Sequence, residues 1–161
     1  EWIEKLKQES KKNGTVGCVV LDKQGNLTAG TSTGGMFKKR WGRIGDSPVI
    51  GAGTYADNNS CAVSCTGHGE YFIRHAVAFD VCARYKYLKE SVEKAADYII
   101  HTELNTNAGN GGLIAVDKLG NIAMPYNSGG MFRGFLYKEK GSPEIKKGCG
   151  IGKKIVVVGE K

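Results

Sequence analysis

The sequence lacks a CxxC motif, and its five cysteines are an odd number. A framework of disulfide bonds is therefore not indicated, and the cysteines are interpreted as reduced, mostly buried small hydrophobic residues. Cys61, Cys65 and His68 could be drawn as metal ligands, but their spacing matches no standard zinc pattern and a fourth ligand is missing. We accordingly expect neither a metal nor another cofactor.

The sequence also lacks an apolar run long enough to span a membrane, and it contains no signal peptide. We therefore expect no membrane partner. Its first residues, EWIEKLKQES, do not begin with Met. The start of a precursor is expected to lie upstream, so the compartment stays open: the cytoplasm is favoured, with the periplasm as the alternative.

A net charge of +7 suggests nucleic-acid binding, but the pattern that would support it is missing. From Lys138 to the end there are seven Lys and three Glu, so much of the excess lies in a tail. The other dense cluster is Lys38, Lys39, Arg40 and Arg43. Because neither an aromatic-studded basic strand nor a basic helix is present, we expect no nucleic-acid partner.

Glycine, in contrast, is abundant. The 161 residues contain 24 glycines, about twice the usual share of roughly 7%. They cluster as GG, GxG and GN and follow no collagen period, which indicates tight turns and close ligand approach. The length suits one domain with its own core.

The order of the predicted elements favours an α+β fold. The elements are a short helix or linker over residues 1–12, strands over 16–21 and 27–33, a strand over 60–67, and helices over 69–88 and 91–104, the last with Ser91 as N-cap. A hairpin, two consecutive helices and a second hairpin indicate an antiparallel sheet with helices on one face. The order is not βαβ, which argues against a dinucleotide-binding fold.

One hairpin pattern occurs twice. Residues 17–37 and 112–132 align without a gap, and Gly, Asp, Lys, Gly, Asn, Gly, Gly, Met and Phe recur in register. The first copy differs by having a hydroxyl at each end: Thr15 begins one strand, and Thr33 ends its partner. Antiparallel pairing is expected to bring these two side chains next to each other.

Thr15 follows Gly14, and this order suits a self-cleaving bond. A threonine hydroxyl becomes a useful nucleophile when the residue is N-terminal, because its own α-amine then serves as base. That amine has an ordinary pKa of about 7.7 to 8.0, so part of it is unprotonated at neutral pH. Gly14 permits a strained backbone, and it has no side chain to obstruct attack of the Thr15 hydroxyl on the Gly14 carbonyl. A plain strand-entry threonine is the alternative interpretation.

Two further stretches carry polar groups suited to a substrate. Arg43 and Asp46 lie in a glycine-flanked loop, where they could bind the α-carboxylate and α-ammonium of an amino acid or simply pair with each other. Thr66, Gly67 and Gly69 lie at a predicted strand-to-helix junction, where a hydroxyl and backbone N–H groups can stabilise an oxyanion.

The motifs GTVGCVVLDKQGNLTAGTSTGGM, GRIGDSPVIGAGTYADN, AVSCTGHGE and GGLIAVDKLGNIAMPYNSGGMFRG together resemble the β-subunit of the plant-type asparaginase and isoaspartyl peptidase family, among the N-terminal nucleophile hydrolases. The similarity covers residues 14 to about 137, and the tail after Ser142 is not part of it. The motifs are specific in combination.

The resemblance implies a precursor that cuts itself between Gly14 and Thr15. Thr15 would be the nucleophile, with its amine as base. Thr33 would support the Thr15 hydroxyl or amine. Thr66 and Gly67 would form the oxyanion hole.

Substrate-binding roles follow from the same resemblance. Arg43 would hold the substrate α-carboxylate, and Asp46 would hold its α-ammonium with help from the backbone at Gly67 and Gly69. The implied reaction is attack on the side-chain carbonyl of asparagine or of a β-aspartyl dipeptide, through an acyl-enzyme that water releases.

The resemblance also implies a fold and a partner. Residues 1–14 would be the end of an α-subunit and residues 15–161 the β-subunit catalytic domain. The family fold is a four-layer αββα sandwich shared by both subunits, of which this chain supplies the β-subunit half. The expected partner is the α-subunit of the same precursor, in an (αβ)2 assembly.

Two other functions stay open at this point. A glycosylasparaginase looks similar around the nucleophile and shares the Arg and Asp loop, although STGGM favours the peptidase. An unprocessed fragment or amino-acid-binding module without catalysis is the non-enzymatic alternative.

Overall fold

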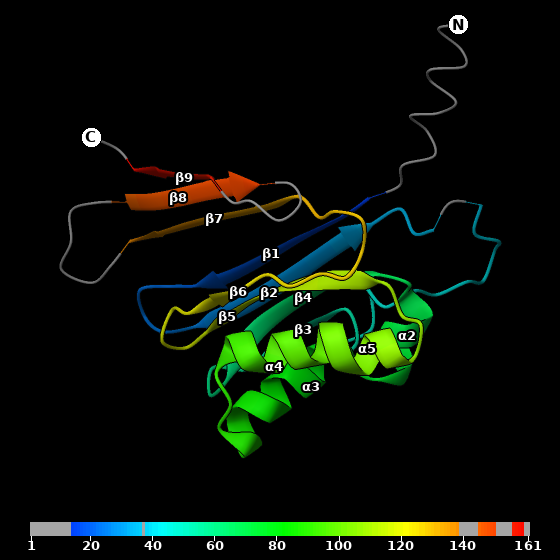
Figure 1. The fold of residues 1–161 in the computed structure, drawn as a ribbon, viewed down its shortest axis with the longest axis horizontal. Coiled ribbons are helices and arrows are strands. Elements are labelled where there is room, and N and C mark those ends of the chain that lie inside the picture. Colours follow the sequence, from blue (N-terminus) through cyan, green and yellow to red (C-terminus); the bar gives the residue numbers. More distant parts are fainter. Residues whose placement is uncertain (1–13, 37, 139–144, 151–155, 160–161) are drawn as a thin grey trace, which may run out of the picture.

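The computed structural model describes residues 14–36, 38–138, 145–150 and 156–159 (Figure 1). The helix or linker expected over residues 1–12 lies outside them. The strands are β1 (Thr15–Leu21), β2 (Leu27–Thr33), β3 (Thr54–Ala56), β4 (Cys61–Gly67), β5 (Gly111–Asp117), β6 (Ile122–Ala123), β7 (Arg133–Lys138), β8 (Ile145–Gly150) and β9 (Val156–Gly159). The helices are α2 (Gly69–Arg74), α3 (Val77–Ala83), α4 (Val92–Tyr98) and α5 (Leu104–Thr106), with π-helical turns at Arg84–Leu88 and Ile99–Glu103.

The centre of the fold is an antiparallel sheet in the order β3-β4-β5-β6, with the helices on one of its faces (Figure 1). In β4, alternate residues Cys61, Val63 and Cys65 join the helices in one buried core. This period of two is what a strand buried on a helical layer requires. The predicted α+β class, with helices on one face of an antiparallel sheet, is confirmed.

The opposite face of the central sheet is covered by the β1-β2 hairpin (Figure 1). Leu27 of β2 packs with Ala62 and Val116 of the sheet in a second buried cluster. The two layers approach closely because Gly17 of β1 lies directly against the Ser64 side chain of β4, where a Cβ atom would clash. Helices, central sheet and hairpin therefore form three layers in this part of the described chain.

The two repeated sequences form the same turn. In the first, Asp22 Oδ1 accepts from the Asn26 N–H at 2.8 Å, and its Oδ2 accepts from the Asn26 amide at 2.9 Å. Asp117 and Asn121 make the corresponding bonds at 2.9 and 2.8 Å in the second. A glycine with positive φ completes each turn, +88° and +90° respectively. Asp, Gly and Asn thus recur because the turn uses all three.

The second hairpin departs from the first after its turn. β6 is two residues long because Pro125 has no N–H to donate and interrupts the ladder. The register nevertheless continues: the Leu113 N–H donates to the Pro125 carbonyl at 3.1 Å, and the Asn127 N–H donates to the Gly111 carbonyl at 2.9 Å.

The prediction of a single helix over residues 69–88 is wrong. The segment is divided into α2 and α3 at Ala76, whose φ is +45°. Left-handed backbone is unfavourable for alanine by roughly 1–2 kcal/mol. In return, the break frees the first amides of α3: the Ala78 N–H donates to the Ala52 carbonyl at 3.1 Å, and the Phe79 N–H donates to the Gly51 carbonyl at 2.9 Å.

The second expected helix is present with its predicted cap. The Ser91 side chain accepts from the Lys94 N–H at 3.3 Å, and α4 begins at the next residue. Helical backbone then continues through a π-helical turn into α5. No helix in the described part of the chain is long and apolar enough to cross a membrane.

The structure adds strands that the sequence pattern did not predict. β3 pairs with β4, and β7, β8 and β9 form a separate antiparallel sheet that includes part of the basic tail. β7 alternates between half-buried and exposed residues. It adds no strand to the central sheet that carries the candidate site.

Candidate functional site

The two predicted hydroxyl residues are direct neighbours. Thr15 pairs with Thr33 across β1 and β2, and the Thr15 hydroxyl donates to the Thr33 Oγ1 at 3.2 Å. The Gly35 N–H donates to the same Thr33 oxygen at 2.9 Å, which orients the Thr33 side chain. Thr15 is therefore held at the mouth of a hairpin, directly after Gly14.

The hairpin carries this pair to the end of the central sheet where β4 leads into α2 (Figure 1). Thr31 Oγ1 lies 2.6 Å from Ser64 Oγ and donates to the Gly53 carbonyl at 3.1 Å. The backbone of Gly17 packs directly against the side chain of Ser64. Thr15 stands two residues before Gly17, and Thr66 stands two residues after Ser64, so these contacts align the hairpin with the end of β4.

Arg43 pairs with a residue that the sequence analysis did not single out. Its Nε donates to Glu70 Oε1 at 2.9 Å, and its Nη2 lies 2.8 Å from the same oxygen. The ion pair expected as an alternative, between Arg43 and Asp46, is replaced by this one in the described structure. Hydrogen bonding, first from its own backbone and then from Arg43, lowers the pKa of Glu70.

Asp46 is a buried carboxylate with an incomplete set of partners. The residue is only 6% exposed, and its Oδ2 is buried without a hydrogen-bond partner in the described structure. Burial raises the pKa of Asp46, while the Arg43 charge acts in the opposite direction. A buried acceptor without a donor is costly unless something else supplies one.

Gly69 brings Arg43 and Asp46 together. A Cβ atom at Gly69 would lie 2.8 Å from Asp46 Oδ1 and 3.2 Å from Arg43 Nη2. Both side chains therefore touch the first residue of α2, and the absence of a side chain at Gly69 leaves room for them. Three of the predicted substrate-binding residues thus share one small site.

The loop that carries Asp46 is anchored on both sides. The Gly53 N–H donates to the Asp46 carbonyl at 3.1 Å, and the Cys65 N–H of β4 donates to the Gly53 carbonyl at 2.8 Å. From the other side, the first amides of α3 hold the carbonyls of Gly51 and Ala52. The broken helix and β4 together fix the position of Asp46.

Thr66 and Gly67 end β4 opposite Gly111 and Gly112 of β5. Gly67 has a φ of +150°, and a Cβ there would lie 2.7 Å from the Gly111 Cα and 2.8 Å from Phe72 Cε2. Phe72 is fully buried. Only glycine fits where the ends of β4 and β5 approach each other this closely.

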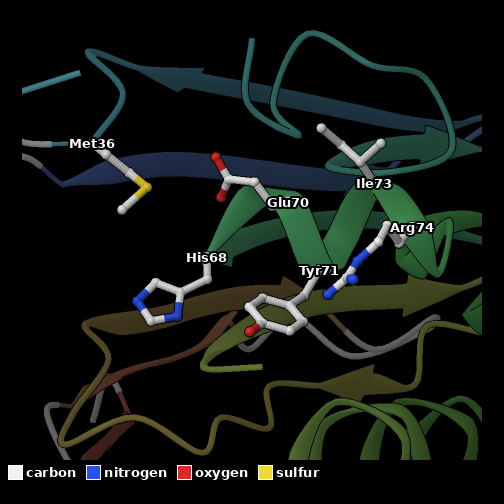
Figure 2. A pocket seen from close by; sticks show the side chains of 6 residues that line it. All are labelled: Met36, His68, Glu70, Tyr71, Ile73 and Arg74. Carbon is white, nitrogen blue, oxygen red and sulfur yellow. The ribbon is translucent and has the colours of Figure 1, made fainter. Parts of the chain in front are cut away.

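A hollow of about 650 Å³ lies beside α2 and is lined by Met36, His68, Glu70, Tyr71, Ile73 and Arg74. Figure 2 shows the Met36 side chain and the Glu70 carboxylate near one another, with the Tyr71 ring beside Arg74. The Arg74 guanidinium lies 4.7 Å from the centre of that ring. Glu70 thus connects the hollow to Arg43.

Sequence reasoning missed three supporting residues: Glu70, Gly111 and Asn127. The Asn127 amide accepts from the Gly111 N–H at 2.8 Å and donates to the Gly109 carbonyl at 2.9 Å. It fixes the strand that crosses Gly67. In the sequence, Glu70 resembles any solvated residue at the start of a helix, apart from following GHG. Asn127 lies in a stretch typical of turns. Neither position therefore carries a sequence pattern that indicates its role.

The described residues contain no cluster of three or more His, Cys, Asp or Glu side chains that could hold a metal ion. Cys61, one of the three residues considered as ligands, instead lies against Cys82. The described site is thus composed of hydroxyl, carboxylate, guanidinium and backbone groups.

Comparison with known proteins identifies the group to which these features belong. A family model described as asparaginase matches residues 2–145. An isoaspartyl peptidase of Salmonella typhimurium is 54% identical over 129 residues, 80% of this chain and 41% of that protein. The Escherichia coli isoaspartyl peptidase is 49% identical over 143 residues, 83% of this chain and 44% of that protein. A mouse protein, isoaspartyl peptidase/L-asparaginase, is 46% identical over 138 residues, which are 81% of this chain and 41% of the mouse protein. The chain therefore spans less than half the length of these relatives.

Proposed function

The chain belongs to the asparaginase family, and from that premise we propose that it is the β-subunit half of a threonine hydrolase acting on β-aspartyl dipeptides and L-asparagine. The relatives' names, isoaspartyl peptidase and isoaspartyl peptidase/L-asparaginase, support this choice of substrates over glycosyl-asparagine. Because the chain covers less than half of each relative, the activity requires the remaining part of the precursor.

The buried, unpartnered Oδ2 of Asp46 beside Arg43 is the observation that carries the proposal. A free α-amino acid group offers one ammonium and one carboxylate, so it supplies the donor that Asp46 lacks. A hydrogen bond to a charged group contributes about 1.5–3 kcal/mol. The binding module without catalysis would share this feature, and the position of Thr15 beside Thr33 supports the hydrolase.

Arg43 is assigned to the substrate α-carboxylate. Its pair with Glu70 uses Nε and Nη2, so we assign Nη1 to the incoming carboxylate. Glu70 holds the guanidinium in a fixed orientation before substrate arrives, which reduces the ordering that binding must impose. Arg43 is suited to this role because its flat guanidinium matches a carboxylate.

Thr15 is the proposed nucleophile. In the precursor its hydroxyl attacks the Gly14 carbonyl, the peptide shifts to an ester, and water releases the ester to leave Thr15 with a free amine. In the mature enzyme that amine removes the hydroxyl proton. The 3.2 Å contact with Thr33 supports this assignment because it orients the oxygen.

The substrate reaction follows the same steps. The Thr15 oxygen attacks the side-chain carbonyl, and the leaving amine or ammonia takes the proton held by the Thr15 amine. Water then hydrolyses the acyl-enzyme. We assign the Thr66 hydroxyl and the backbone of Gly67 to stabilisation of the oxyanion. Gly67 lies tightly against β5 and Phe72, so its backbone has little room to move while negative charge develops.

The partner is the α-subunit of the same precursor, completing a four-layer αββα sandwich. The outward face of β1 supports this: Val16 is 69% exposed and Val20 47% exposed in this chain. A second sheet extended from β1-β2 and covered by helices of the α-subunit would bury them. An (αβ)2 assembly follows the family resemblance.

The test uses the full-length precursor. We expect mass spectrometry to find a fragment that begins with Thr15, and the processed protein to hydrolyse a β-aspartyl dipeptide and L-asparagine. A clear preference for glycosyl-asparagine would assign the glycosylasparaginase function. A single uncut chain that binds L-aspartate without turnover would assign the binding module.

A further inference from the structure

Two buried cysteines that play no part in the proposed hydrolysis lie in direct contact. The sulfurs of Cys61, the first residue of β4, and Cys82, in α3, are 2.8 Å apart. Cys61 is fully buried and Cys82 is 2% exposed. A disulfide bond has an S–S length of about 2.05 Å, so bonding requires an approach of about 0.8 Å.

A small cavity reaches Cys82 of this pair. Its volume is about 30 Å³, and Cys82 is one of the residues that line it, with Asp57, Ser60 and Lys86 among the others. One water molecule occupies about 30 Å³ in the liquid. The cavity therefore admits water or a molecule of similar size, such as hydrogen peroxide, and excludes glutathione or other thiol reagents.

The hydrogen bonds assign different roles to the two thiols. The Cys82 S–H donates to the Cys61 carbonyl at 3.2 Å, so the Cys61 S–H is the donor between the two sulfurs. The hydrogen bond from Cys61 lowers the pKa of Cys82, and the same bond together with burial raises the pKa of Cys61. Cys82 is thus the thiol that both faces the cavity and ionises first.

We propose that Cys61 and Cys82 form an oxidation site at which hydrogen peroxide produces an intramolecular disulfide. The Cys82 thiolate attacks one peroxide oxygen, the O–O bond breaks, and the hydroxide released takes a proton to become water, leaving a sulfenic acid. The Cys61 sulfur then attacks the Cys82 sulfur, the S–O bond breaks, and the second water leaves with the Cys61 proton. Two thiols and one peroxide become one disulfide and two waters.

The disulfide would join the first residue of β4 to α3, at the end of the strand away from the candidate site. β4 ends at Thr66 and Gly67, and α3 anchors the loop that carries Asp46. Oxidation would therefore tie together the two elements that position the substrate. The inference rests on the sulfur geometry, the hydrogen bonds of the two thiols and the cavity, so it holds whether or not the proposed hydrolysis is correct.

The experiment treats the folded full-length protein with hydrogen peroxide after the exposed Cys18 and Cys149 have been blocked with N-ethylmaleimide. Denaturation in acid and digestion with trypsin follow. Cleavage at Arg43, Arg74 and Arg84 places Cys61 and Cys82 in separate peptides, residues 44–74 and 75–84. We expect these peptides to be linked, with a mass lower by two hydrogen atoms, and dithiothreitol to separate them.

Variants identify the sulfurs and their order of reaction. Cys61→Ala should abolish the link and leave Cys82 with added oxygen, whereas Cys82→Ala should abolish it and leave Cys61 reduced. Cys65→Ala is the matched control, because Cys65 is equally buried in the same strand, and the link should persist. A link from Cys65 instead of Cys61, or peptides that stay reduced and unlinked in the unmutated protein, would overturn the proposal.

Discussion

Substitution of Gly69 disturbs the proposed ammonium site most directly. A Cβ at Gly69 would lie 2.8 Å from Asp46 Oδ1 and 2.9 Å from the Asp46 backbone nitrogen, whereas ordinary contact begins at 3.4 Å. Gly69→Ala must therefore displace the carboxylate by about 0.6 Å. Gly69 begins α2, where alanine is otherwise a favourable residue.

The magnitude follows from the contact that is disturbed. A hydrogen bond between charged groups contributes about 1.5–3 kcal/mol, and every 1.4 kcal/mol is about tenfold in affinity. We expect Gly69→Ala to weaken L-aspartate binding and to lower kcat/KM for a β-aspartyl dipeptide by about ten- to a hundredfold. Processing before Thr15 should continue.

The assay combines calorimetric titration of L-aspartate with steady-state kinetics and thermal unfolding. Gly130→Ala is the matched control, because a Cβ there meets no atom within 4 Å in this chain. If Gly69→Ala binds L-aspartate as tightly as the control does while its Tm is unchanged, Asp46 and Gly69 do not form the ammonium site and the reasoning fails.

Three further predictions concern the nucleophile, the buried charge and the strand crossing. Thr15→Ala should leave the precursor uncut at Gly14 and without turnover, whereas Thr15→Ser should still be cut and react more slowly; intact mass and kinetics distinguish these outcomes, and a cut Thr15→Ala protein would exclude the proposed role. Asp46→Asn should raise the Tm of the ligand-free protein near neutral pH: burial raises the pKa of Asp46, so its ionisation costs stability that is absent below the unfolded-state pKa, grows as the pH rises above it and is complete above the folded-state pKa. Thermal unfolding across pH measures the difference, and a lower Tm at neutral pH would show that the charge is compensated. Gly67→Ala should lower the free energy of unfolding by about 1–3 kcal/mol or more, because its Cβ would overlap the Gly111 backbone and Phe72; denaturant titration checks this, and an unchanged midpoint would mean that the crossing relaxes.

Much of the candidate site was predictable because it depends on strand pairing and turn chemistry. The first hairpin is fixed by its Asp, Gly and Asn turn, and its register brings Thr15 opposite Thr33. Spacing alone also placed Ser91 at a helix start, where it caps α4. These features are set by residues close in sequence, so a local pattern carries them.

Other features depend on contacts between distant segments and had no local signal. The break at Ala76 is such a case: the sequence around it is a good helix, and the competing interaction comes from the carbonyls of residues 51 and 52. Glu70 is another, since its partner Arg43 lies 27 residues away. The strands β8 and β9 are a third case: β8 pairs with β7 and β9 pairs with β8, within a Lys- and Gly-rich tail whose composition is unusual for strands.

The division between α2 and α3 also gives the molecule an internal reporter. The amide hydrogens of Ala78 and Phe79 are held by the carbonyls of the loop that carries Asp46. Their exchange with solvent deuterium requires that this loop separate from the helix, so their protection measures how often the proposed ammonium site opens. Two helical amides, remote in sequence from the carboxylate, thus record the mobility of the loop proposed to bind the substrate.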